Sequence, residues 1–389
     1  MVKKILIVWA AAIAGLFTGY YLVAHTNILK IGENNINIVS ALLPPKKVSL
    51  GFLPFWLIDK TKSDYSNYIN ELSYFNLTID SDGTIQKFTA PGESDPGWHA
   101  LSSGKVDNFL AFEKSKGVNL SLTVFSGNDT KIDSFLQNPD QSAQNLVSEI
   151  SPIMNQYGFS DLNLDIEKVA DASPSARLSY VKFVTSVRNL LDKSITITAD
   201  VPPISFVKDT NLADPKALAD IVNYIVLMDY DFHNPGSFVT GPVSPESGAG
   251  IVSEFDTESA VQAALTTMPA SKLILAIPLY GYSWETINPV PRSAVIPASA
   301  LSKSNRSAEE FLAQCATCSA VFDTTDQESH VIYKDTGTGT YHQIFYPDKI
   351  STQTKINFIK SENLGGVALW ALGYEGNTIL DPLAGMGSN

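Results

Sequence analysis

The chain has 389 residues but few cysteines and a shortage of basic side chains, and each shortage excludes classes of protein. Two cysteines cannot build a disulfide-rich scaffold. The 27 Lys and Arg residues against 40 Asp and Glu residues leave a formal net charge of −13. Because nucleic acids and anionic membrane surfaces bind basic faces, we expect neither as a partner. A neutral polymer such as a polysaccharide is compatible with this charge.

Motifs of several common enzyme classes are also missing. The five histidines are scattered, without the H-E-x-x-H spacing of zinc enzymes, so we expect no catalytic metal and no other cofactor. The absence of G-x-S-x-G removes the usual esterase arrangement. No G-x-G-x-x-G follows the first apolar run, which disfavours a dinucleotide-binding open sheet.

A stretch without charged residues, Ile5–Ala24, follows Lys3 and Lys4 near the N-terminus. Twenty helical residues are long enough to cross a hydrocarbon core of about 30 Å. Lysines before such a stretch favour a cytoplasmic N-terminus and export of the rest of the chain. A cleaved signal peptide, which would give a secreted protein, is the alternative, although Leu22-Val23-Ala24 is a poor cleavage site.

These observations predict three parts. Residues 1–24 are expected to be a cytoplasmic tip and a single-pass transmembrane anchor, and residues 25–46 a stalk. Residues 47–389 are then the main domain, outside the cytoplasm. In that compartment the C-x-x-C pair Cys315 and Cys318 is expected to form a local disulfide. A zinc site would need two further ligands, which the neighbouring sequence does not offer.

Short apolar runs alternate with longer segments of helical spacing after residue 47. Most runs are continuous and not alternating, as expected for parallel strands covered on both faces. The helical segments include Gln141–Tyr157 and Pro174–Leu191, the second with a predicted apolar stripe from Leu178 through Val181, Val184 and Val187. The eight predicted strands are Val48–Leu53, Leu72–Ile79, Val118–Phe125, Leu162–Ile166, Ile195–Ala199, Ile221–Met228, Leu273–Leu279 and Gly366–Trp370.

Eight strands alternating with helices predict an α/β fold, namely a (β/α)8 TIM barrel. The connection Glu285–Gly365 is far longer than an ordinary βα crossover. It contains two further strand candidates, Val331–Tyr333 and Gln343–Tyr346. We therefore expect a small α+β lobe, residues 285–345, inserted between strands seven and eight.

The fourth predicted strand carries a row of polar side chains. Side chains alternate along a strand, so Asp161, Asn163, Asp165 and Glu167 share one face. Glu167 comes at the carboxyl end, where barrel active sites are built. Crowded carboxyls raise the pKa of one of them, as a general acid at neutral pH requires. A calcium loop and a solvated edge strand are the alternatives, but the loop would need Gly at residue 166 and Glu at residue 172.

At this point the sequence resembles glycoside hydrolase family 18, the chitinase-like barrels. The family's D-x-x-D-x-D-x-E lines up with Ser160, Asn163, Asp165 and Glu167. Four further motifs match in order, from about residue 47 to residue 381. They are Ser49-Leu-Gly-Phe-Leu-Pro-Phe-Trp56, Met228-Asp-Tyr-Asp231, Pro278-Leu-Tyr-Gly-Tyr-Ser-Trp284 and Gly366-Val-Ala-Leu-Trp370.

Two positions depart from the pattern: Ser160 and Asn163 replace the first two aspartates. Asn at the second position also occurs in the cell-wall and spore-cortex branch of the family, which tilts the expected substrate toward peptidoglycan. Asp161 stands where the family usually has Gly. The residues alone give no physical account of that exchange.

The resemblance implies hydrolysis of an N-acetylated glycan, chitin or peptidoglycan, assisted by the substrate's own acetamido group. Glu167 would protonate the leaving oxygen, Asp165 would hold the acetamido N–H, and Tyr230 would donate to the acetamido oxygen. Trp370 would form the floor beneath the sugar. Tyr230 and Trp370 could instead be core aromatics, and Asp231 a helix cap. The residues expected to contact the substrate are Asn163, Met228, Asp231, Trp370, Trp56, Tyr280 and Trp284, with Trp98 as either a stacking or a structural residue.

Two other functions remain open on the sequence. A barrel of this kind can bind glycans without cleaving them, as a lectin-like surface protein, although such relatives usually lose the acid that is present here as Glu167. A surface scaffold that binds another protein through the inserted lobe is the third hypothesis.

Overall fold

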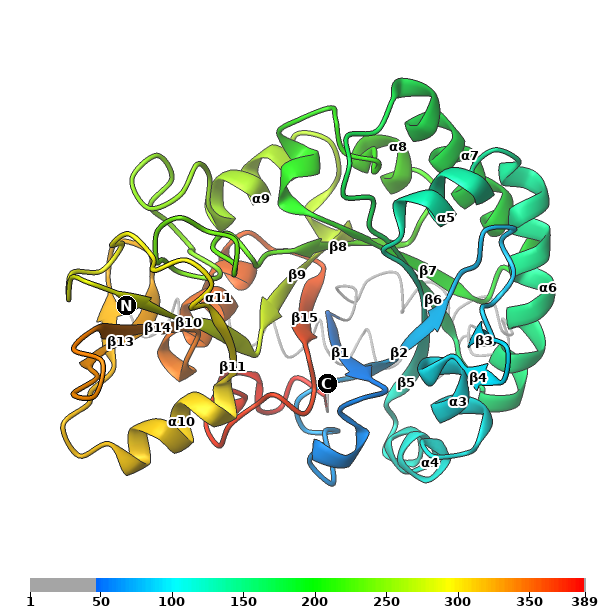
Figure 1. The fold of residues 1–389 in the computed structure, drawn as a ribbon. Helices are drawn as coiled ribbons and strands as arrows, with labels where there is room; N and C mark the ends of the chain where they lie inside the picture. Colours follow the sequence, from blue (N-terminus) through cyan, green and yellow to red (C-terminus); the bar gives the residue numbers. More distant parts are fainter. Residues whose placement is uncertain (1–46, 388–389) are drawn as a thin grey trace, which may run out of the picture. The chain divides into compact units, whose positions relative to one another are not determined.

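A closed barrel of eight parallel strands forms the centre of residues 47–387, which are the residues that the computed structural model describes (Figure 1). Going round the barrel, the strand order is β1-β15-β9-β8-β7-β6-β5-β2, and β2 pairs with β1 to close it. The predicted barrel is therefore confirmed. Its strands are β1 (Val48–Pro54), β2 (Glu71–Thr78), β5 (Asn119–Ser126), β6 (Asp161–Ile166), β7 (Thr196–Val201), β8 (Tyr224–Met228), β9 (Leu273–Pro278) and β15 (Gly366–Trp370).

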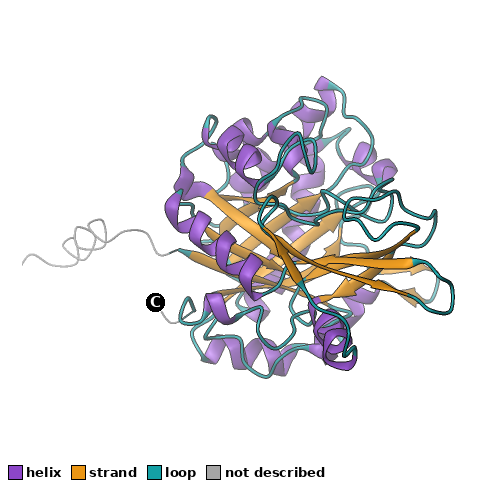
Figure 2. Cartoon of the chain, turned by 90° about the vertical axis from the view of Figure 1, so that its left-hand side faces the viewer, coloured by secondary structure: helices purple, strands orange, loops and turns teal. Residues whose placement is uncertain are grey.

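Helices surround the barrel on its outer side (Figures 1 and 2). Most begin at a capping side chain or at a proline, both of which favour a helix start. The α-helices are α3 (Pro96–Ser102), α4 (Asp107–Ser115), α5 (Asp129–Phe135), α6 (Pro139–Tyr157), α7 (Pro174–Leu190), α8 (Pro215–Ala219), α9 (Thr257–Leu265) and α11 (Lys349–Ser361). Short 3-10 turns are η3 (Ile58–Lys60), η4 (Pro203–Phe206), η5 (Ala270–Lys272) and η6 (Asp381–Leu383), and β3 (Phe88–Ala90) pairs with β4 (Glu93–Ser94) as a hairpin.

The apolar stripe of α7 differs from the predicted one at its first member. Leu178 is 71% exposed, whereas Tyr180, Phe183 and Val184 are buried against the strands. Successive residues turn by about 100° around a helix, so a stripe through Tyr180 places Leu178 on the opposite face. The two aromatic residues, and not the leucine, define the buried side.

The barrel interior is divided into an apolar and a polar half. Strands β1, β8, β9 and β15 contribute apolar side chains to the inside, in a cluster that includes Phe52, Val226 and Ile274. Strands β2, β5, β6 and β7 contribute buried polar side chains. These are Ser73, Ser121, Thr123, Asp161, Asn163, Asp165, Thr198 and Asp200.

An inserted lobe comes between β9 and β15 in the sequence, although these two strands are paired neighbours in the barrel (Figure 1). It holds an antiparallel sheet of order β11-β10-β14-β13-β12 and the helix α10 (Asn305–Gln314). Its first strand begins at Tyr280, two residues after β9 ends, and so before the predicted start at residue 285. No turn residue separates the two strands in the sequence, which hid the boundary. The lobe strands are β10 (Tyr280–Thr286), β11 (Leu301–Ser304), β12 (Val321–Asp323), β13 (Glu328–Lys334) and β14 (Tyr341–Tyr346).

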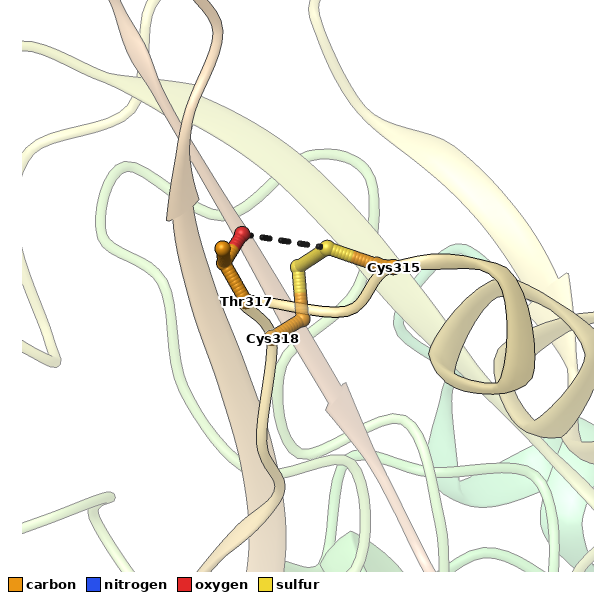
Figure 3. The surroundings of a disulfide bond; sticks show 3 residues. All are labelled: Cys315, Thr317 and Cys318. Atoms are coloured by element: carbon orange, nitrogen blue, oxygen red, sulfur yellow. Dashed lines mark hydrogen bonds between the residues drawn. A yellow bond between two sulfur atoms is a disulfide. The ribbon is translucent and has the colours of Figure 1, made fainter.

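The predicted disulfide is present in the lobe. Cys315 follows the last turn of α10 and is bonded to Cys318, with an S–S distance of 2.02 Å (Figure 3). The predicted transmembrane stretch Ile5–Ala24 and the stalk lie outside the described residues. None of the helices between residues 47 and 387 combines the length and the hydrophobicity that a membrane span needs.

A buried ion pair connects α11 to the end of β8. Lys355 Nζ lies 2.6 Å from Asp229 Oδ2, and the two side chains are 4% and 0% exposed. The same carboxylate oxygen accepts from Thr257 Oγ1 at 2.6 Å and from Ser244 Oγ at 3.0 Å. The pair therefore holds β8, α9 and α11 together at a buried position.

We expect Lys355→Met to lower the free energy of unfolding by about 3–5 kcal/mol, because it leaves the Asp229 carboxylate buried without its cation. Lys349→Met is the matched control in the same helix. Its bridge to Asp381 is solvent-exposed and should contribute only about 0–1 kcal/mol. Urea unfolding followed by circular dichroism measures both, and equal losses would contradict the expectation.

Candidate active site

A pocket of about 430 Å3 opens at the carboxyl ends of the barrel strands. This is the face of a (β/α)8 barrel on which active sites are built. Its wall combines aromatic rings with several carboxyls. The lining residues are Phe55, Trp56, Phe75, Asn76, Thr78, Asp95, Phe125, Asp165, Glu167, Asp200, Met228, Tyr230, Asp231, Tyr280 and Trp370.

Strand β6 presents its polar face to the barrel interior, as its alternation predicts. Leu162, Leu164 and Ile166 belong to the apolar layer between strands and helices. The polar face rises from the deeply buried Asp161 to Asp165 at the pocket. Glu167, the next residue on that face, follows the end of the strand and is exposed to the pocket.

Asp165 and Glu167 form a hydrogen-bonded carboxyl pair. Burial raises the pKa of Asp165 well above its usual range, and the charges of Glu167 and Asp200 raise it further. Desolvation by the surrounding pocket walls also raises the pKa of Glu167, assisted by the charge of Asp231, while the hydrogen bond from Asp165 opposes that rise. The pair therefore retains a proton at a pH at which an ordinary carboxyl has lost it. Of the two carboxyls, that of Glu167 is the one exposed in the pocket.

Asp161 has hydroxyl donors in place of a charged partner. Its carboxylate accepts from Ser121 Oγ at 2.6 Å on β5, and from Thr196 Oγ1 at 2.7 Å and Thr198 Oγ1 at 3.1 Å on β7. Burial raises its pKa to about 6 in spite of these bonds. The hydroxyls on the two neighbouring strands thus provide the physical account of Asp161 that the sequence does not supply.

Asn163, one of the predicted substrate contacts, is not among the residues that line the pocket. It is fully buried, and its Nδ2 donates to Thr198 Oγ1 at 3.0 Å and to Asp200 Oδ1 at 2.7 Å. Asp200, which does line the pocket, was missed by the sequence argument. The available signal was an aspartate at the end of the apolar run of β7.

Asp231 lies at the rim, where two tyrosines hold its carboxylate. Tyr280 Oη donates to Asp231 Oδ1 at 2.6 Å and Tyr282 Oη donates to the same atom at 2.8 Å. Asp231 has a φ of 61°, and it is not a helix cap, because Asp256 caps α9. Tyr230 lies half-buried beside it, and burial among carboxyls raises the pKa of this phenol, so its hydroxyl keeps its proton.

Aromatic rings form the apolar part of the wall. Trp370 contacts Phe75 and Trp56, with ring centroids 4.5 Å and 6.4 Å away, and Trp56 is 45% exposed. Trp284, another predicted sugar contact, is 0% exposed and packs against Phe345 in the lobe, outside the pocket lining.

Of two further predicted residues, one lies outside the pocket lining and the other belongs to it. Trp98 is outside the pocket lining and packs, partly buried, against the main apolar core. Met228 is nearly buried at the base of the lining. Among residues 47–387, no group of three or more His, Cys, Asp or Glu side chains is arranged to hold a metal ion.

Comparison with known proteins places this geometry in a family. The cortical fragment-lytic enzyme of Bacillus anthracis is 27% identical over 325 residues, which cover 82% of this chain and 67% of that enzyme. The solved Group IV chitinase of Ostrinia furnacalis in complex with allosamidin has a TM-score of 0.74 at 18% identity, covering 87% of this chain and 97% of that one. The Bacillus cereus spore cortex-lytic enzyme SleL has a TM-score of 0.68 at 22% identity, covering 87% and 74%. Finally, the family model "Glycosyl hydrolases family 18" matches residues 39–375, so the chain belongs to this family of glycoside-hydrolysing enzymes.

Proposed function

We propose that the protein cleaves β-1,4 bonds of glycan polymers that contain N-acetylglucosamine, with retention of configuration. The observation that carries this proposal is the Asp165–Glu167 pair, in which a carboxyl with a raised pKa borders an aromatic-lined pocket. A general acid needs these properties, namely access to the substrate and a proton held at working pH.

The first step breaks the glycosidic bond. Glu167 transfers its proton to the glycosidic oxygen, and the leaving sugar departs as an alcohol. The carbonyl oxygen of the substrate's 2-acetamido group attacks the anomeric carbon from the opposite face and forms a cyclic oxazolinium ion. Asp165 accepts a hydrogen bond from the acetamido N–H, and the Tyr230 hydroxyl donates to the attacking oxygen before its attack.

The second step restores the enzyme. The Glu167 carboxylate removes a proton from a water molecule, whose oxygen attacks the anomeric carbon and opens the oxazolinium ring. The acetamido group is regenerated, and Glu167 is again protonated. Two inversions at one carbon leave the configuration unchanged.

The remaining carboxyls favour a nucleophile that comes from the substrate. A protein nucleophile would be a second free carboxylate beside the acid. Asp231 is engaged by two phenols, and Asp200 by the amide of Asn163. Neither is presented as an unattached nucleophile, so the acetamido group takes this role in the proposal.

Chitin and peptidoglycan are the two candidate polymers. Both contain the 2-acetamido group on which the proposed mechanism depends, and the aromatic floor at Trp370 suits the C–H face of either sugar. The relatives' names include a cortical fragment-lytic enzyme and a chitinase, which supports both. A glycan-binding protein without activity is the second candidate, favoured by the departures at Ser160 and Asn163.

We further propose that the barrel is tethered outside the cytoplasm by residues 1–24. The charge-free stretch Ile5–Ala24 supports the anchor, and the Cys315–Cys318 disulfide supports an oxidising compartment.

We expect Glu167→Gln to lower kcat by about 10²- to 10⁴-fold, because the amide cannot donate the acid's proton or activate water. N-acetylglucosamine oligomers and purified peptidoglycan strands serve as substrates, with products read by mass spectrometry. Glu254→Gln, at an exposed carboxylate paired with Lys208, is the control and should keep native activity. Binding of these glycans by the native protein without turnover would identify the glycan-binding candidate instead.

The pH dependence has a definite sign. Catalysis requires protonated Glu167, and its pKa is raised, so kcat/KM should fall as the pH rises through that raised pKa. The alkaline limb should therefore lie above the ordinary glutamic acid value of about 4.3. A pH–rate profile with the N-acetylglucosamine tetramer measures it, and a limb at or below the ordinary value would argue against Glu167 as the acid.

Membrane attachment is tested by fractionation. The full-length protein should sediment with membranes and require detergent for release, because a span of about 20 apolar residues does not detach in salt. A variant lacking residues 1–24 should stay soluble. A soluble native protein whose mass lacks the N-terminal residues would show a cleaved signal peptide in place of an anchor.

A further inference from the structure

Asp200 lies in the same layer of the barrel as Asp165, on the neighbouring strand. In the parallel pairing of β6 with β7, Asn163 is level with Thr198 and Leu164 with Ala199. The next inward-facing residues along the two strands are Asp165 and Asp200. Adjacent strands lie about 4.8 Å apart, so the two carboxyls are side-by-side neighbours at the base of the pocket.

The Asn163 amide is held in one orientation by β7. Both of its N–H bonds are used, one toward Asp200 Oδ1 at 2.7 Å and the other toward Thr198 Oγ1 at 3.0 Å. Only its oxygen remains available. Asn163 Oδ1 is buried and has no hydrogen-bond partner among the described residues, and the same is true of Asp165 Oδ1.

Each of these two oxygen atoms lacks a hydrogen-bond donor. Asn163 and Asp165 are consecutive inward-facing residues of β6, about 6.5–7 Å apart along the strand. An amide oxygen accepts but cannot donate, so a hydrogen bond between these two oxygens would require a protonated Asp165. Turning the amide to offer an N–H instead would break two buried hydrogen bonds, at a cost that Asp200 and Thr198 impose together.

The charged groups facing Asp200 add to this effect. They are Asp161 and Asp165 on β6 and Glu167 just after it. The neutral hydroxyls of Tyr180 on α7 and Tyr230 after β8 also face it. All of the ionisable groups in this set are acids. Several carboxyls this close in a buried site cannot all lose their protons at the same pH.

We propose that Asp200 supplies, from β7, the second carboxyl that β6 lacks at Asn163, and that it is a positioning residue that keeps a proton on the Asp165–Glu167 pair. This inference rests on the proposed function, since that proton is the one given to the glycosidic oxygen. The carboxyl stands on the neighbouring strand, and the Asn163 amide connects it to β6.

Asp200→Asn tests the charge without removing the hydrogen bond, because the new amide oxygen can still accept from Asn163. With one carboxyl fewer to ionise beside it, the pair loses its proton more easily. The alkaline limb of kcat/KM for the N-acetylglucosamine tetramer should therefore move to lower pH, by roughly one pH unit, with KM little changed. Asp209→Asn, at a carboxylate 98% exposed, is the matched control and should leave the profile in place.

The double variant Asn163→Asp with Asp200→Asn returns the carboxyl to β6. It should move the alkaline limb back toward the native position, whereas Asn163→Asp alone adds a carboxyl and should move the limb upward. A profile for Asp200→Asn that matches the native one would overturn the proposal. So would a double variant that shifts further in the same direction as Asp200→Asn.

A second measurement separates this inference from the proposed function. Infrared spectra of the full-length proteins, recorded against pH, follow the C=O stretch of protonated buried carboxyls without any turnover. If the native protein is silent toward all glycans, the proposed function fails, and the spectra still decide the charge coupling. A C=O band that is lost at lower pH in Asp200→Asn supports it, and an unchanged band overturns it.

Discussion

Protons shared among buried carboxyls are the feature on which the rest of the site depends. One half of the barrel interior is filled by apolar side chains, and the other half by hydroxyls, one amide and carboxyls. Hydroxyls and an amide are the hydrogen-bond partners that the structure gives Asp161 and Asp200, and no lysine or arginine is among them. Burial without a cation favours the protonated form. The barrel thus holds protons near Glu167, at the edge of the pocket where a substrate can receive one.

A cation within this set would have the opposite effect. Asp229, only one strand away and outside the pocket, has Lys355 as its partner, and there the pair joins β8, α9 and α11. The two arrangements use the same side-chain type for different purposes. A charged partner fixes a carboxylate in place, whereas neutral donors leave its proton exchangeable.

The sequence predicted the parts of the site that depend on strand periodicity. The alternation along β6 located the inward-facing row, and the strand ends located Glu167, Tyr230 and Trp370 at one pocket. It did not predict which strands become neighbours at which register, and for that reason Asp200 was missed and Asn163 was assigned to the substrate. Trp284 was misplaced for a related reason, because apolar alternation does not show whether a strand belongs to the barrel or to the inserted sheet. Residues 1–46, which carry the predicted anchor, lie outside the part of the chain that the structure describes.

The join between barrel and lobe has an architectural consequence. Strand β9 ends at Pro278 and β10 begins at Tyr280, with one residue between them. The same extended segment therefore belongs first to the barrel and then to the inserted sheet. Tyr280 and Tyr282 on that segment donate hydrogen bonds to Asp231, which follows the neighbouring strand β8. The lobe is consequently part of the pocket wall. Replacing it with another inserted domain would remove the residues that hold Asp231 at the pocket entrance.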